Sequence, residues 1–205
     1  MQPSSLNYQY LRRTIAGPIF LAFMIVSAQA LPQTDPREVV ELTVNSILLT
    51  LQDSNLDQAK KKHQITEIAS RHFDFEAMTS RVLATNWKRA TTADQRRITQ
   101  LFKQMLIETY WQKMSRYSDE QVEFLQEQSR SEEYVSCPTL IRTNANLIPV
   151  DYKLYRVGNT WMAYDVVIEQ VSLVRNYRGK FQSIVRDDGI PGLISHLESQ
   201  NEASP

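Results

Sequence analysis

The sequence of 205 residues has little of several features that would point to a defined chemistry. Cys137 is its only cysteine, so no intramolecular disulfide can form and stability must come from packing. Basic and acidic residues number 23 each, without the basic excess that marks nucleic-acid-binding proteins. His63, His72 and His196 show no metal-ligand spacing, and the Gly-x-Ser-x-Gly motif of lipases is absent. These absences disfavour disulfide-rich, nucleic-acid-binding, metal-dependent and lipase-like proteins.

Hydrophobic runs are short as well. The apolar run from Ile15 to Val26 follows Arg12-Arg13 and precedes Ala28-Gln29-Ala30, which is the order of a secretory signal peptide. The run has 12 residues, whereas a membrane-spanning helix needs roughly 20, and Gly17-Pro18 interrupts it. We therefore predict that residues 1–30 are a signal peptide cleaved after Ala30. No cysteine at the cleavage point offers a lipid anchor, so we expect a soluble, exported product.

Residues 31–205 have the length of a single domain, which would bury roughly 70% of its unfolded surface. Without Arg12 and Arg13, 21 basic residues remain against 23 acidic ones, so this domain is nearly neutral. The segment from Val150 to Phe181 is dense in large apolar side chains and contains no recognisable nucleophile, metal cluster or phosphate loop. Binding of an apolar ligand is therefore a better first hypothesis than catalysis.

The first half of the predicted domain has helical periodicity. Asp35-Pro36 supplies an N-cap and a first-turn proline, and the apolar spacing predicts a helix over 36–51. The polar run 52–62 predicts a loop before a shorter helix, and Asp74 is expected to cap the next helix. Thr92-Ala93-Asp94-Gln95 has the spacing of a capping box that begins a long helix. The apolar stripe of that helix is broad enough to line a cavity, with an ordinary core helix as the alternative.

The second half alternates apolar and polar residues, as half-buried antiparallel strands do. Strands are expected around 122–124, 134–143, 148–154 and 161–168, with a hairpin turn at 157–160. Pro138 is expected at an edge or bulge, because proline cannot donate to a sheet ladder. Helical spacing returns from Val174, stops at Asp187-Asp188-Gly189 and resumes at Pro191. The predicted fold is α+β, with a curved antiparallel β-sheet of about four to five strands packed against a layer of helices and enclosing an apolar cavity.

Short motifs follow one another along nearly the whole predicted domain, from about Asp35 to Leu197. They are Phe73-Asp74-Phe75 with Met78, Trp87 with Ala90-Thr91, Gln95, Phe102, Leu106 and Tyr110, Val150-Asp151-Tyr152, Trp161 with Tyr164-Asp165-Val166, and Glu169 with Val171-Ser172-Leu173. In order and spacing they resemble the MlaC family, the toluene-tolerance family of periplasmic phospholipid-binding proteins in Gram-negative bacteria. The chain departs from the family pattern at Ala84 and Gln170, where glycine is expected, and at Gly179, where a polar residue is commoner.

The resemblance implies a periplasmic carrier, not an enzyme, that holds a phospholipid with its acyl chains inside the protein and its headgroup near solvent. The implied partners are an outer-membrane complex of the lipoprotein MlaA with porins and the inner-membrane Mla ABC transporter. The implied role is keeping the outer leaflet of the outer membrane free of phospholipid. We expect a monomer whose bound lipid is cargo, with no cofactor.

The expected lining of the lipid pocket is apolar and comes from both helices and strands. The candidates are Phe75, Met78, Leu83, Phe102, Leu106, Tyr110, Val150, Tyr152, Val166, Val171, Leu173, Phe181 and Ile184. Val171 is the most specific candidate, because it follows the last predicted strand, where a cavity mouth would lie. Arg175, Tyr177 and Arg178 are candidate headgroup contacts, since guanidinium groups pair well with phosphate, and a solvated helix face is the alternative.

Two other function classes fit the sequence. Curved-sheet folds also host isomerases and dehydratases that use a carboxylate and a tyrosine, for which Tyr164-Asp165 or Asp151-Tyr152 would be candidates. Neighbouring residues of a strand point to opposite faces, which argues against either pair converging on one substrate atom. A buried Asp165 that faces the pocket would favour the enzyme. A periplasmic adaptor or chaperone that binds protein through an apolar surface is the third class.

Overall fold

The computed structural model describes residues 34–116, 120–144 and 146–203, and the predicted signal peptide lies outside them. The helices are α1 (Pro36–Gln52), α2 (Gln58–His72), α3 (Phe75–Leu83), the 3₁₀ helix η1 (Ala84–Arg89), α4 (Thr92–Met114) and α5 (Leu173–Glu202). The strands are β1 (Gln121–Phe124), β2 (Gln128–Ser131), β3 (Tyr134–Arg142), β4 (Leu147–Val157), β5 (Thr160–Ile168) and β6 (Val171–Ser172). This arrangement confirms the predicted α+β class.

Short polar side chains mark the starts of the first three α-helices, because each accepts a hydrogen bond from an amide of the first turn. Asp35 and Asp74 cap α1 and α3 as predicted, each at 2.8 Å from its amide donor. The start predicted for the second helix was too late. Asp57 accepts from the amide of Lys60 at 2.8 Å, so α2 begins at Gln58 and the preceding loop is limited to residues 53–57.

The capping box of α4 lies one residue earlier than predicted. The Thr91 hydroxyl accepts from the amide of Asp94 at 3.2 Å, and the Asp94 carboxylate accepts from the amide of Thr91 at 3.3 Å. Thr92 is therefore the first helical residue instead of the cap. Gln95 donates to the carbonyl of Trp87 at 2.7 Å, which ties the start of α4 to η1.

The sheet is antiparallel, with the strand order β1-β3-β4-β5-β6, and β2 pairs with β3 beside β1. The predicted strands are all present in the described part of the chain, and the structure adds the short strands β2 and β6. All four residues of β2 are exposed, so no hydrophobic alternation indicated this strand.

Pro138 lies in β3, which has partners on both sides, so of the two predicted positions, an edge or a bulge, the edge is wrong. β1 pairs with β3 as far as Thr139 and β2 pairs with it from Ser136, which leaves Pro138 at the gap between these two partners. The Pro138 carbonyl accepts from the amide of Leu125 at 3.0 Å on the same side. The N–H and C=O of one residue point to the same side of an antiparallel strand, so the missing N–H falls where the ladder is interrupted.

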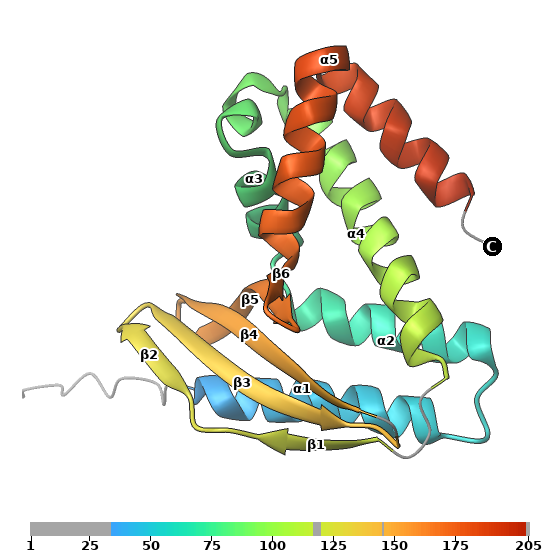
Figure 1. The fold of residues 1–205 in the computed structure, drawn as a ribbon, viewed down its shortest axis with the longest axis vertical. Coiled ribbons are helices and arrows are strands. Elements are labelled where there is room, and N and C mark those ends of the chain that lie inside the picture. The colour runs from blue at the N-terminus through green and yellow to red at the C-terminus, as the bar shows by residue number, and fades with distance from the viewer. Residues whose placement is uncertain (1–33, 117–119, 145, 204–205) are drawn as a thin grey trace, which may run out of the picture. The chain divides into compact units, whose positions relative to one another are not determined.

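Helices cover one face of the sheet in separate groups, with α1 lying along the strands and α3, α4 and α5 grouped beyond β5 and β6 (Figure 1). One hydrophobic cluster joins α1 to β3, β4 and β5 and includes Val44 and Leu154. A second cluster joins α3, α4 and α5 to the sheet and includes Phe102 and Val166. A third, small cluster around Trp111 joins α1, α2 and α4. The core is therefore divided among three groups of packed side chains.

The chain from α2 into α3 is fixed to the edge of β5. The amide of Asp74 donates to the carbonyl of Ala163 at 2.9 Å, and the Tyr155 hydroxyl donates to the Asp74 carboxylate. On α3, the Arg81 guanidinium lies 4.5 Å from the ring centre of Tyr164. These contacts hold α3 in place beside the sheet.

The last helix changes direction at Gly189, which has φ 71° and ψ −173° (Figure 1). The predicted break at 187–189 and the restart at Pro191 both fall on this kink. The two arms of α5 then pack against α3 and α4 through residues such as Phe181 and Leu193.

Two positions where the family pattern predicts glycine have positive φ. Ala84, between α3 and η1, has φ 52°, and Gln170, in the turn between β5 and β6, has φ 67°. Glu169, the other residue of that two-residue turn, has φ 48°, which is the pattern of a type I′ turn. The chain therefore adopts the glycine-type backbone at these positions with side chains present.

Candidate binding cavity

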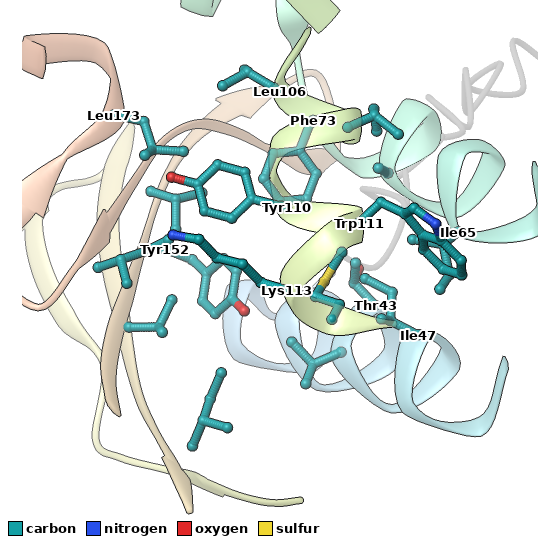
Figure 2. A pocket seen from close by; sticks show the side chains of 18 of the residues that line it. Thr43, Ile47, Ile65, Phe73, Leu106, Tyr110, Trp111, Lys113, Tyr152 and Leu173 are labelled. Atoms are coloured by element: carbon teal, nitrogen blue, oxygen red, sulfur yellow. The ribbon is translucent and has the colours of Figure 1, made fainter. Parts of the chain in front are cut away.

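A cavity of about 280 Å³ lies between the covered face of the sheet and the helices. This volume is close to the lower end of the range of roughly 300–1,000 Å³ typical of small-molecule sites. Figure 2 shows how several elements contribute to its wall: Ile47 from α1, Ile65 from α2, Leu106 and Trp111 from α4, Tyr152 from β4 and Leu173 from the start of α5. Nearly all lining side chains are apolar.

The cavity lies where the three hydrophobic clusters meet. Val44 belongs to the α1 cluster, Ile65 and Trp111 to the small cluster, and Met78 and Val166 to the α3–α4–α5 cluster, and all five line the cavity. The α1 cluster and the α3–α4–α5 cluster each pack onto their own part of the sheet, and the small cluster joins helices only. The space between the groups stays unfilled by protein side chains, whereas a continuous core would close it.

The lining changes from fully buried to partly exposed. Met78 and Leu106 are at most 5% exposed. The partly exposed lining residues include Met114 at the end of α4, Ile148 at the start of β4 and Ile168 at the end of β5. The cavity therefore opens towards the end of α4 and the adjoining sheet turns.

Few polar groups line the cavity, and its hydroxyl groups carry no charge at neutral pH. The Thr43 hydroxyl donates to the carbonyl of Val39 at 2.6 Å within α1. Burial raises the pKa of Tyr110 and of Tyr152 to about 12, so both phenols remain protonated at neutral pH. The charged lining residues are Lys62, Lys113 and Glu169. This lining suits an apolar ligand with a polar end at the opening.

Comparison with known proteins agrees with this geometry. Residues 41–199 match the family described as MlaC protein. The chain belongs to the MlaC family. This finding confirms the resemblance carried by the sequence motifs.

A solved structure shares the MlaC-family fold seen here. It is a phospholipid-binding protein from Ralstonia solanacearum in complex with a phospholipid, and its sequence is 22% identical to this chain. The TM-score is 0.77, and the match covers 82% of this chain and 98% of that chain. At this identity the likeness establishes the fold.

Most of the lining residues expected from the sequence of this MlaC-family chain do line the cavity. They are Phe75, Met78, Leu106, Tyr110, Val150, Tyr152, Val166 and Leu173. Their contact with a ligand remains a prediction.

Other expected lining residues lie in the protein core instead. Leu83, Phe102 and Phe181 are at most 2% exposed in the α3–α4–α5 cluster, and Ile184 packs against the same cluster. The Phe102 and Phe181 rings contact edge to face, with centres 5.3 Å apart. These side chains pack among α3, α4 and α5, on the helical side of the core, and do not line the cavity.

Val171 is 54% exposed and is not part of the cavity lining. It pairs with Ile168 across the β5–β6 turn, and Ile168 and Glu169 both line the cavity. Val171 therefore lies next to the rim, as an exposed apolar side chain.

The candidate headgroup contacts do not line the cavity. Tyr177 packs against Phe102, with ring centres 5.2 Å apart, and is half-buried. Arg178 donates to the carbonyl of Arg81 at 2.9 Å, and Arg175 is exposed. Arg178 thus binds the end of α3, and any headgroup role for the three residues remains a prediction.

Neither candidate catalytic pair lines the cavity together. Tyr164 and Asp165 lie at the irregularity of β5 opposite Lys153 and Leu154, outside the lining, and of the other pair only Tyr152 lines the cavity. Asp165 is buried, but it accepts from the Ser172 hydroxyl at 2.6 Å and from the amide of Val174 at 3.0 Å, so it supports the start of α5 and does not line the cavity. Asp151 accepts from the Ser136 hydroxyl at 2.6 Å, away from the cavity that Tyr152 lines. The described residues include no group of His, Cys, Asp and Glu that could hold a metal ion, and no helix among them is long and apolar enough to span a membrane.

Sequence reasoning missed the contribution of the first two helices to the lining. Thr43, Val44 and Ile47 of α1 and Ile65 and Ala69 of α2 all face the cavity. Their helical periodicity was visible, but it indicated only that these faces are buried. Whether a buried face meets protein or an open space depends on how helices far apart in sequence pack.

Proposed function

We propose that this MlaC-family protein is a phospholipid carrier that holds acyl chains in the cavity and leaves the headgroup at the opening. The observation that carries the proposal is an apolar cavity that is closed at one end by Met78 and Leu106 and opens at the other beside charged residues. The phospholipid bound to the structurally similar Ralstonia solanacearum protein supports the same conclusion.

A carrier is needed because lipid tails are poorly soluble. Exposing acyl chains to water costs about 0.8 kcal/mol per methylene, which for roughly 30 methylenes amounts to on the order of 20 kcal/mol. An apolar protein interior offsets this cost through the hydrophobic effect. Transfer breaks no covalent bond, so the protein needs no acid, base or metal. The positions of Asp151 and Asp165 away from the cavity support a carrier over an enzyme.

The proposed location is the periplasm. There the protein would exchange phospholipid with an outer-membrane complex of MlaA and porins and with the inner-membrane Mla ABC transporter. The family membership supports this route and the proposed role in keeping the outer leaflet free of phospholipid. A deletion strain is expected to accumulate phospholipid in its outer leaflet, and a strain with unchanged outer-leaflet phospholipid would contradict the role.

Carrier activity is tested by transfer between vesicles. Donor vesicles contain a fluorescent phospholipid that is quenched until it moves to unlabelled acceptor vesicles. We expect the protein to increase the transfer rate in proportion to its concentration, since each molecule shields one cargo from water. Heat-unfolded protein serves as the control, because it keeps the composition and loses the cavity. A transfer rate equal to that of vesicles alone would contradict the proposal.

A further inference from the structure

The charged residues in the cavity lining differ in whether they have partners. Lys62 forms an ion pair with Glu108, on the neighbouring helix α4. Lys113 and Glu169 form no ion pair with any described residue. Within residues 34–116, 120–144 and 146–203, the lining of the cavity therefore includes one cation and one anion without an ion-pair partner.

Lys113 is placed to reach a ligand at the opening. It lies in the last turn of α4, and its ammonium group is 5.5 Å from the ring centre of Tyr110, which also lines the cavity. Figure 2 shows its side chain extended from the helix towards Tyr110. The methylenes of a lysine can lie along apolar surface while the ammonium group stays at the edge of water.

A phospholipid with its tails in the cavity has its phosphate at this opening. The lysine ammonium is a compact charge with three donors that can follow a phosphate as it moves. We propose that Lys113 binds the phosphate of the lipid cargo, and that Glu169 on the same rim lowers the affinity for headgroups of net negative charge. This inference rests on the proposed carrier function. It assigns headgroup recognition to the end of α4 and the β5–β6 turn.

The test compares two lipids that differ only in the headgroup. Phosphatidylglycerol and diacylglycerol with identical acyl chains, each labelled on one chain, are titrated into delipidated protein. Wild-type protein is expected to bind phosphatidylglycerol about three- to fivefold more tightly at low salt, and the difference should shrink at high salt because an exposed charge pair is screened.

Two substitutions, one that removes a positive charge and one that removes a negative charge, then separate the effect of charge from a loss of structure. Lys113→Gln is expected to lower phosphatidylglycerol affinity severalfold and to bring it close to that of diacylglycerol. Glu169→Gln is expected to raise phosphatidylglycerol affinity, because a repulsive charge is removed. Lys88→Gln is the matched control, since Lys88 is exposed on η1 and does not line the cavity.

The outcomes distinguish this inference from the carrier function. Wild-type protein that binds both lipids equally, or a Lys113→Gln variant that keeps the wild-type ratio, would overturn the phosphate site and leave the carrier intact. Wild-type protein that binds neither lipid would instead remove the carrier function. A Glu169→Gln variant with weaker phosphatidylglycerol binding would contradict the assigned role of that carboxylate.

Discussion

Burial decides the chemistry of Cys137. Its side chain lies under α1 in the cluster with Leu154 and is 3% exposed, and burial raises the pKa of the thiol to about 12. The thiolate is the reactive form, so the folded protein is expected to resist thiol reagents at pH 8. Reaction with a chromogenic disulfide should be slow for the native protein and complete within minutes in denaturant. Rapid stoichiometric labelling of folded protein would show that the thiol is accessible.

Val171 tests the rim of the cavity. A carboxylate at the rim would cost about 1–3 kcal/mol where it meets the acyl chains, which corresponds to a loss of lipid affinity of roughly 5- to 150-fold. Val171→Glu is therefore expected to fold and to lose most of its co-purifying lipid. Val157→Glu is the matched control, because Val157 is also an exposed valine, at 43%, and lies at the other end of β4 from the cavity. Equal lipid retention by the two variants would remove Val171 from the rim.

The start of α4 provides a test at the scale of an element. Thr91→Ala removes the N-cap and is expected to lower the free energy of unfolding by about 1 kcal/mol. Thr92→Ala replaces an exposed first-turn residue with a better helix former and is expected to change stability by less than about 0.5 kcal/mol. Urea denaturation of both variants measures the difference. The reverse ranking would place the capping box at Thr92, as the sequence pattern first predicted.

The β5–β6 turn is expected to be strained by its side chains. Gln170 has φ 67°, and a type I′ turn prefers glycine there, so Gln170→Gly is expected to stabilise the protein by roughly 0.5–1 kcal/mol. Gln182→Gly is the control, because Gln182 is exposed within α5 and glycine in a helix costs about 1 kcal/mol relative to alanine. Thermal unfolding should rank the two variants on opposite sides of the wild type. A destabilised Gln170→Gly variant would contradict the turn geometry.

At the scale of the whole molecule, buried acids with raised pKa values predict the response to alkali. Burial raises the pKa of Tyr110, Tyr152 and Cys137 to about 12 in the folded protein. In the unfolded chain these groups lose their protons at lower pH, so unfolding releases protons and stability falls as pH rises from about 9 towards 12. Urea midpoints at pH 8, 10 and 11 measure the fall, which Tyr152→Phe should reduce. A midpoint that does not change over this range would contradict the burial of these groups.

The fold was largely predictable because local signals agreed with the global arrangement. Asp35-Pro36 and Asp74 marked helix starts, alternation marked β4, the hairpin turn at 157–160 marked the start of β5, and Gly189 marked the kink in α5. The local signals failed where two neighbouring residues were equally good helix caps, and where a strand had no alternation of apolar and polar residues. Adjacent threonines shifted the cap of α4 by one residue, and β2 has four exposed residues that pair only because β3 lies beside them.

The cavity was harder to predict than the fold. A buried apolar residue has the same sequence pattern whether it meets another side chain, as Phe102 meets Phe181, or an open space, as Leu106 does. The difference arises only when the three hydrophobic clusters are brought together. No sequence motif indicated a binding role for Lys113. Its place at the opening follows from where α4 ends beside the sheet.

The proposed carrier function requires that the cavity between the helix groups and the sheet holds phospholipid tails. Mass spectrometry of an organic extract from the purified, folded protein tests it most directly. We predict phospholipid in near-stoichiometric amounts. A folded protein whose extract contains no phospholipid would contradict it.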